Sequence, residues 1–142
     1  MMDRKASAEW QGGLKDGKGT LSTTSGVLKQ TQYSFSARFE NGQGTNPEEL
    51  LAAAHAGCFA MALSNELEKA GLKANKLETT CTITIGQVKD GFGITKSYLE
   101  LVATIPGADK AKFDAAVKSA ETGCPVSKLF KTDIKVSARL IA

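Results

Sequence analysis

The chain has 142 residues, of which 42% are hydrophobic and 23% are charged. This length fits one domain, residues 1–142, that can bury a core without disulfides or metals, and the composition excludes a disordered or fibrous chain. The net charge of +3 comes from scattered basic and acidic residues, so the sequence predicts no nucleic-acid partner.

The N-terminus runs directly into polar residues without the apolar segment of a secretory signal. The longest apolar stretch, Leu50 to Leu63, is interrupted by His55 and is shorter than the ~20 residues that cross a bilayer. We therefore expect a cytoplasmic protein with no membrane partner.

The first forty residues have the pattern of β-strands. Turn signals at residues 16–19 follow a short strand around Trp10. Aromatic residues then alternate with polar ones over residues 33–39, which predicts a strand with its aromatic side chains inward and Arg38 on the opposite face.

The strongest helix signal begins at Asn46. Asn46 is a good N-cap, Pro47 suits the first helical position, Glu49 stands at the capping-box position, and Gly71 is a stop signal after Lys69. Apolar residues occupy every face of this helix, which predicts that it is buried and central. Its many Ala and Gly residues would let another backbone approach closely.

The remaining elements alternate between strands and helices. Strands are predicted at 78–88 and 94–105, a helix from Asp109 to Gly123, a short helical turn through Phe130, and a last strand at 134–140. Together with the first forty residues this order predicts an α+β fold with mostly antiparallel sheets.

Three cysteines and one histidine form neither a disulfide framework nor a metal-binding motif. Cys81 shares a strand face with isoleucines and is expected to be an inert core residue. Cys124 precedes Pro125 as a helix N-cap, where free backbone N–H groups lower a thiol pKa, unless it is an incidental cap. Cys58 lies in the central helix and by pattern alone is a core residue or a reactive one.

Two such thiols can meet in space although they are far apart in sequence. One thiolate would attack a peroxide and become a sulfenic acid, and the second would condense with it to a disulfide. The first thiol then needs a positive neighbour, for which an arginine oriented by a carboxylate is suited.

Residues 44–59, GTNPEELLAAAHAGCF, and residues 123–127, GCPVS, resemble the two motifs of the OsmC/Ohr family, named after osmotically inducible protein C and organic hydroperoxide resistance protein. The resemblance extends over nearly the whole chain, and His55 points to the OsmC branch, because the other branch usually has a tyrosine there. It implies an OsmC-like intertwined homodimer with sheets around long central helices.

The resemblance also implies a thiol peroxidase for organic hydroperoxides that is weaker on hydrogen peroxide. By this likeness Cys58 is the peroxidatic thiol, Cys124 is the resolving thiol, and Arg38 and Glu48 form the ion pair that keeps the attacking thiol ionised. It implies no metal, haem or flavin cofactor, and a dithiol reductant such as a lipoylated protein.

Helix geometry adds a constraint on Glu48. In a straight helix ten residues place Glu48 roughly 15 Å from Cys58 along the axis. Either the helix breaks near residues 56–57, or Glu48 acts on Cys58 of the partner subunit. We favour the second reading, with active sites at the subunit interface. His55 either bonds near the site or is a satisfied core histidine, and the latter is favoured.

Two other functions are compatible with the same residues. The thiols could form a non-enzymatic redox sensor, in which the disulfide changes partner binding, or they could line the pocket of a small-molecule binding domain.

Overall fold

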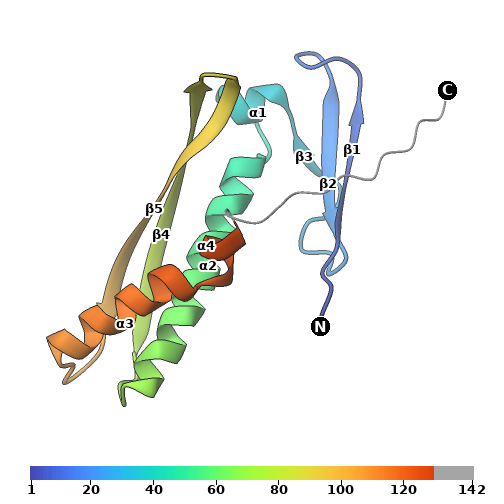
Figure 1. Cartoon of the computed structure of the whole chain (residues 1–142). Coiled ribbons are helices and arrows are strands. Elements are labelled where there is room, and N and C mark those ends of the chain that lie inside the picture. Colours follow the sequence, from blue (N-terminus) through green and yellow to red (C-terminus); the bar gives the residue numbers. More distant parts are fainter. Residues whose placement is uncertain (130–142) are drawn as a thin grey trace. The chain divides into compact units, whose positions relative to one another are not determined.

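A computed structural model describes residues 1–129 (Figure 1). Two compact units divide the chain: Met1–Ala53 with Thr82–Ser97, and Ala54–Cys81 with the described residues from Tyr98 onward. One long helix and one long hairpin contribute residues to both units. The single domain over residues 1–142 therefore stays a prediction.

The first unit opens with an antiparallel sheet of β1 (Ala6–Gln11), β2 (Lys18–Thr23) and β3 (Thr31–Tyr33), in the order β1-β2-β3. Gly19 pairs with Trp10 on one side and Tyr33 on the other. A Cβ at Gly19 would collide with both rings, so the glycine leaves the space in which they pack, with centroids 5.4 Å apart.

A short helix, α1 (Phe35–Phe39), stands where a strand was expected, so the prediction for residues 33–39 was wrong after Tyr33. Ser34 is its N-cap and accepts a hydrogen bond from the N–H of Ala37 at 3.1 Å. The period-two pattern misled because Phe35 and Phe39 also share one face of a helix, where their rings lie 5.0 Å apart. Arg38 is therefore a helical residue.

Helix α2 (Pro47–Lys69) begins and ends as predicted. Asn46 Oδ1 accepts the N–H of Glu49 at 2.8 Å. After the last turn, Gly71 takes φ +77° while the N–H of Leu72 bonds the carbonyl of Leu67 at 2.8 Å, a glycine-based helix stop. The predicted capping box was wrong in one detail. The Glu49 carboxylate was expected to bond the backbone N–H of the N-cap residue, but it accepts a hydrogen bond from the Thr45 hydroxyl at 2.8 Å.

The prediction that α2 is buried on every face was wrong for the single chain. Buried residues form one stripe along the helix: Glu48, His55, Phe59, Leu63 and Leu67. Ala53, Ala54, Gly57 and Met61 are exposed on another side. The sequence shows how apolar a face is, but not whether its own chain covers it. Length and composition would also allow α2 to cross a membrane, a test that core helices of soluble proteins pass as well.

The hairpin of β4 (Lys76–Val88) and β5 (Gly91–Thr104) turns at residues 89–90, which makes the strands antiparallel. One face of each strand is half-buried and the other is exposed. Cys81 lies on the half-buried face, as its strand pattern predicted, but it is not one of the buried core residues. At the hairpin's turn, Phe92 packs on Phe39 with ring centroids 5.2 Å apart.

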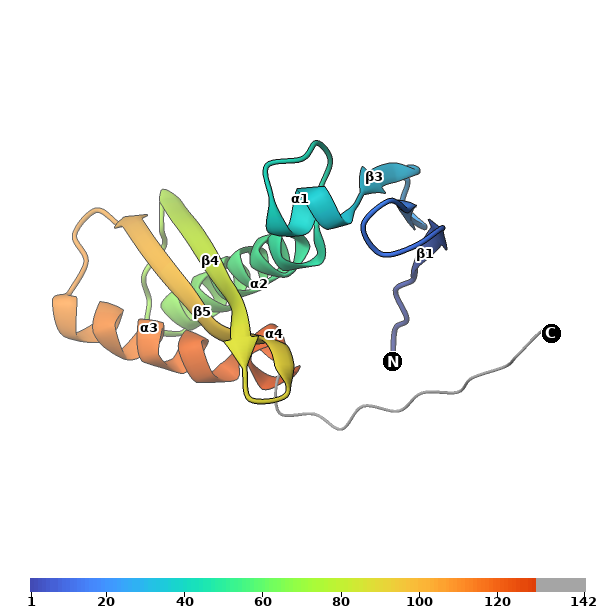
Figure 2. The same ribbon diagram turned by 90° about the horizontal axis from the view of Figure 1, so that it is seen from above.

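The core of the second unit lies between α2, the hairpin and α3 (Lys110–Gly123). Figure 2 shows these three elements from a second direction. Asp109 caps α3 by accepting the N–H of Ala111. Six buried side chains make up this core: Phe59, Leu63, Leu67, Ala116, Ala120 and Cys124. Leucines of the hairpin pack against them.

Helix α4 (Pro125–Leu129) follows α3 directly. The predicted end of this turn at Phe130 and the predicted last strand, 134–140, lie outside the described residues. Helices with antiparallel sheets confirm the α+β prediction.

Candidate active site

The second unit brings two cysteines together. Cys58 on α2 and Cys124 at the junction of α3 and α4 are 66 residues apart, and their Sγ atoms lie 2.9 Å from each other. A disulfide would need about 2.05 Å, so a small movement converts the pair of thiols into a bond. Cys124 is fully buried and Cys58 is half-buried. The juxtaposition expected from the sequence is therefore present.

The surroundings of Cys124 favour its thiolate. Burial raises the pKa of Cys124, but hydrogen bonds from the Cys58 thiol, from the backbone N–H groups of Ser127 and Val126, and from the Ser127 hydroxyl outweigh burial and lower it. The backbone donors are those of the first turn of α4, as predicted for an N-cap cysteine. Ionisation of this thiol is therefore supported within one chain.

The surroundings of Cys58 have the opposite effect. Burial and the neighbouring Cys124 raise the pKa of Cys58, and a backbone hydrogen bond from Val126 offsets this only in part. A raised pKa disfavours the thiolate that would attack a substrate. If Cys58 is the attacking thiol, it needs an additional positive charge.

The first unit holds an ion pair between Arg38 of α1 and Glu48 of α2. Arg38 Nε lies 3.0 and 3.2 Å from the two carboxylate oxygens, and Nη2 lies 2.7 Å from Oε1. The Glu48 side chain is 8% exposed and that of Arg38 is 40% exposed. The fork geometry fixes the guanidinium, which keeps further N–H donors beyond those that Glu48 binds. The expected Arg38–Glu48 pair is thus present in this unit.

Local structure explains the position of this pair. Asn46 caps α2 and also donates from Nδ2 to the carbonyl of Ala37 at 3.0 Å, which joins the start of α2 to α1. Glu48 points to Arg38, while Glu49 bonds Thr45. The two adjacent acids therefore have different partners.

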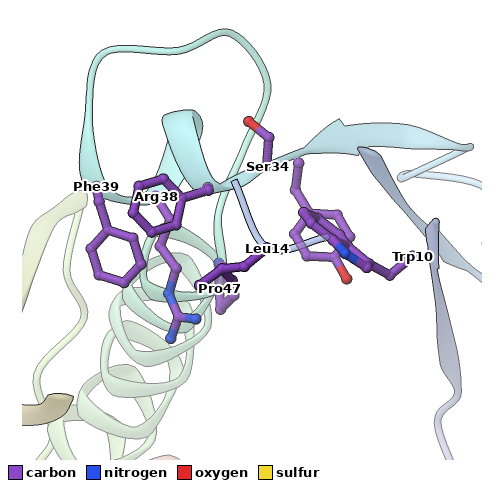
Figure 3. Close-up of a pocket in the computed structure, with 8 residues that line it drawn as sticks. Trp10, Leu14, Ser34, Arg38, Phe39 and Pro47 are labelled. Atoms are coloured by element: carbon purple, nitrogen blue, oxygen red, sulfur yellow. The ribbon is translucent and has the colours of Figure 1, made fainter. Parts of the chain in front are cut away.

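A pocket of about 290 Å³ lies beside Arg38 in the same unit (Figure 3). Aromatic and aliphatic side chains make most of its wall, and Ser34 and Arg38 are its polar members: Trp10, Leu14, Tyr33, Ser34, Phe35, Arg38, Phe39 and Pro47. The guanidinium carbon of Arg38 is 5.2 Å from the Phe39 ring centroid. This site can hold an apolar group next to a cation. Sequence reasoning missed it, although the clustering of aromatic residues at 33–39 was a signal.

His55 lies one turn before Cys58 on α2 and is 5% exposed. Its Nε2 lies 2.9 Å from Ser127 Oγ, and hydrogen bonds from Ser127 in turn lower the pKa of Cys124. Burial lowers the pKa of His55, which favours the neutral imidazole. His55 is a bonded core histidine, as favoured above, and also reaches the thiol pair through Ser127. Sequence reasoning assigned no role to Ser127.

Residues 40–139 match the model of the family described as OsmC-like protein. "Peroxiredoxin OsmC" of Escherichia coli is 47% identical over 137 residues, which cover 96% of each chain. "Organic hydroperoxide resistance protein" of Xanthomonas axonopodis is 37% identical over 100 residues, 70% of this chain and 68% of that protein.

Solved structures give the same result. The organic hydroperoxide resistance protein OhrB of Bacillus subtilis superposes with a TM-score of 0.65 at 26% identity, and covers 89% of this chain and 90% of its own. An OsmC-like protein from Vibrio cholerae has a TM-score of 0.73 at 17% identity, covering 94% and 96%, and shares the fold. Together with the match to residues 40–139, these likenesses show that the chain belongs to the OsmC-like family.

Proposed function

We propose that this protein is a thiol peroxidase that reduces organic hydroperoxides through Cys58 and Cys124. The observation that carries this proposal is the 2.9 Å separation of two sulfur atoms from distant parts of the chain. The relatives named as a peroxiredoxin and as organic hydroperoxide resistance proteins support peroxide chemistry.

The reaction uses two thiols in order. The Cys58 thiolate attacks the distal oxygen of ROOH, the O–O bond breaks, and RO⁻ takes a proton to leave as the alcohol. Cys58 is now a sulfenic acid. The Cys124 thiolate attacks its sulfur, the S–O bond breaks, and hydroxide leaves as water once it is protonated. An external dithiol then supplies two electrons and two protons, and itself becomes a disulfide.

The lowered pKa of Cys124 serves this sequence in both directions. Its thiolate attacks the sulfenic acid, and the same sulfur is a good leaving group when the disulfide is reduced. Cys58 needs help, because burial raises its pKa. We assign that help to the guanidinium of Arg38, oriented by Glu48.

We further propose that this guanidinium belongs to the partner subunit of a homodimer. Helix α2 continues without a break through residues 56–57, so Glu48 and Cys58 are roughly 15 Å apart along its axis. The exposed small residues of α2, Ala53, Ala54 and Gly57, form a surface on which a second helix can pack closely. An antiparallel partner helix would place its first turn beside Cys58.

The pocket beside Arg38 supplies the substrate preference in this proposal. Its aromatic wall would hold the organic group of a hydroperoxide while the guanidinium stabilises the leaving alkoxide. Hydrogen peroxide has no apolar group to bury there and should react more weakly. The chemistry needs no metal, haem or flavin, and a lipoylated protein in a reducing, cytoplasmic compartment would be a suitable dithiol.

Turnover of cumene hydroperoxide with dihydrolipoamide tests the function. An enzyme cycles many times, a redox sensor reacts once, and a binding domain does not react. We expect Cys58→Ser to abolish consumption, and Cys124→Ser to stop after one equivalent with a sulfenic acid that dimedone traps. Cys81→Ser is the matched control and should retain turnover. If Cys58→Ser turned over normally, the assignment of the attacking thiol would be wrong.

A further inference from the structure

A chain of hydrogen bonds leads from the thiol pair to a buried imidazole. The Ser127 hydroxyl is one of the hydrogen-bond donors that lower the pKa of Cys124, and Ser127 Oγ lies 2.9 Å from Nε2 of His55. Ser127 is half-buried at the start of α4 and His55 is buried on α2, so the connection joins two elements across the core of the second unit. The attack of Cys58 on a peroxide makes no use of these two residues.

The donor count of serine gives this chain a direction. A hydroxyl has one proton to donate, so Ser127 donates either to His55 or to Cys124. While Cys58 is a thiol, the S–H of Cys124 points to Cys58 Sγ. Once Cys58 is oxidised, this S–H can turn to Ser127 Oγ, and the serine proton then points to Nε2. When Cys124 is a thiolate, the serine proton points to sulfur and Nε2 carries a proton that points to Ser127. The two states differ by the movement of a proton from sulfur to imidazole.

We propose that Ser127 and His55 are a proton relay for Cys124 in the resolving step. This rests on the proposed function. Cys124 gives its proton to Ser127 Oγ while the serine proton passes to Nε2 of His55. The thiolate then attacks the sulfur of the Cys58 sulfenic acid, an S–S bond forms, and hydroxide leaves. The proton on His55 returns to this hydroxide, so one water is released. Ser127 contacts the reacting sulfur, whereas His55 is a positioning residue that acts through Ser127.

The surroundings of the relay suit transient proton uptake. Burial keeps His55 neutral at rest, because it lowers the pKa of this imidazole, and the imidazolium would form beside the opposite charge of the thiolate. Of the residues that the structure describes, Cys58 and Cys124 are titratable groups on the thiol side. On the helices that carry the relay, Glu121 and Lys128 are exposed.

On α2, Glu48 lies seven residues before His55 and is bound to Arg38. Glu66, eleven residues after His55, is half-buried and bonds Lys69.

Single-turnover kinetics separate the relay from the first step. One equivalent of cumene hydroperoxide is added to the reduced full chain, and alcohol release and disulfide formation are followed separately across the range in which thiols titrate. We expect Ser127→Ala to slow disulfide formation about tenfold or more, as for loss of a hydrogen bond to a charged atom, while alcohol release is unchanged. His55→Gln should slow the same step and change its pH profile, because glutamine cannot take up the proton.

Two further variants guard against a merely structural effect. Ser127→Thr keeps the hydroxyl and should restore disulfide formation, and Ser119→Ala removes an exposed serine of α3 and should match the wild type. Disulfide formation in Ser127→Ala with the wild-type rate and pH profile would overturn the relay. Slowing of alcohol release to the same extent would overturn it too. A wild-type protein that releases no alcohol would instead refute the proposed function.

Discussion

Mixing two inactive variants, Arg38→Ala and Cys58→Ser, is expected to restore peroxidase activity. In the proposed homodimer each active site combines Arg38 of one subunit with Cys58 of the other. A mixed dimer then has one site that lacks both groups and one site that is whole. If Arg38 served the thiol of its own subunit, every site in the mixed dimer would carry one defect.

The magnitude follows from the structure and from two-fold symmetry. Along the unbroken helix α2, Glu48, which binds Arg38, lies ten residues and roughly 15 Å before Cys58 in the middle of the helix. When equal amounts of the two variants exchange subunits at random, half of the dimers are mixed. Each mixed dimer has two active sites, of which one is intact. The expected activity is about a quarter of the wild-type value.

The assay exchanges subunits by dilution from denaturant and measures cumene hydroperoxide turnover with dihydrolipoamide. Each variant treated alone is the blank. A mixture of Cys58→Ser with Cys124→Ser is the matched control: these two sulfurs meet within one chain, so its mixed dimers should have no whole site. No recovery in the first mixture, with mixed dimers demonstrated by mass, would refute the assignment of Arg38 to the partner's thiol.

Three further results are expected. In the Cys58→Ser variant the new serine hydroxyl can still donate a hydrogen bond to Cys124. The rate at which iodoacetamide alkylates Cys124 should then rise with a pH midpoint below the ordinary thiol pKa of about 8.5, because the pKa of Cys124 is lowered. A midpoint at the ordinary value would contradict this. The urea midpoint should fall as pH decreases below about 6.5, because the unfolded chain protonates His55 first, and His55→Gln should lessen this fall; an equal fall in both would refute it. Gly44→Ala should lower the free energy of unfolding by about 1–3 kcal/mol, since Gly44 has φ +101° and a Cβ would collide with the Gln32 carbonyl; Gly26→Ala, with open space around it, should cost less.

Local chemistry made several elements predictable. Asn46, Pro47 and Gly71 set the limits of α2, and Asp109 set the start of α3, because caps and stop signals act within one turn. The alternation of aromatic and polar residues over 33–39 predicted a strand wrongly, because a local helix cap acted against it. A cap at Ser34 competes with the strand pattern, and the pattern alone does not show which wins.

The site was predictable to a different degree. Cys58, Cys124, Arg38 and Glu48 were selected from the sequence largely by resemblance, and the structure pairs them as two thiols and one ion pair. Ser127 was not selected, because a serine after a cysteine-proline turn has no sequence signal that separates a cap from a thiol partner. The aromatic wall around Arg38 was read as a core.

The sequence by itself determined the limits of the long helix, the α+β class, and which thiol sits at a helix N-terminus, because these depend on neighbours in the chain. Only the tertiary structure decided that Cys124 meets Cys58, that His55 reaches Ser127, and that one side of α2 stays uncovered. The physical reason is that these contacts join residues far apart in sequence, whose approach is set by the packing of a whole core rather than by any local preference.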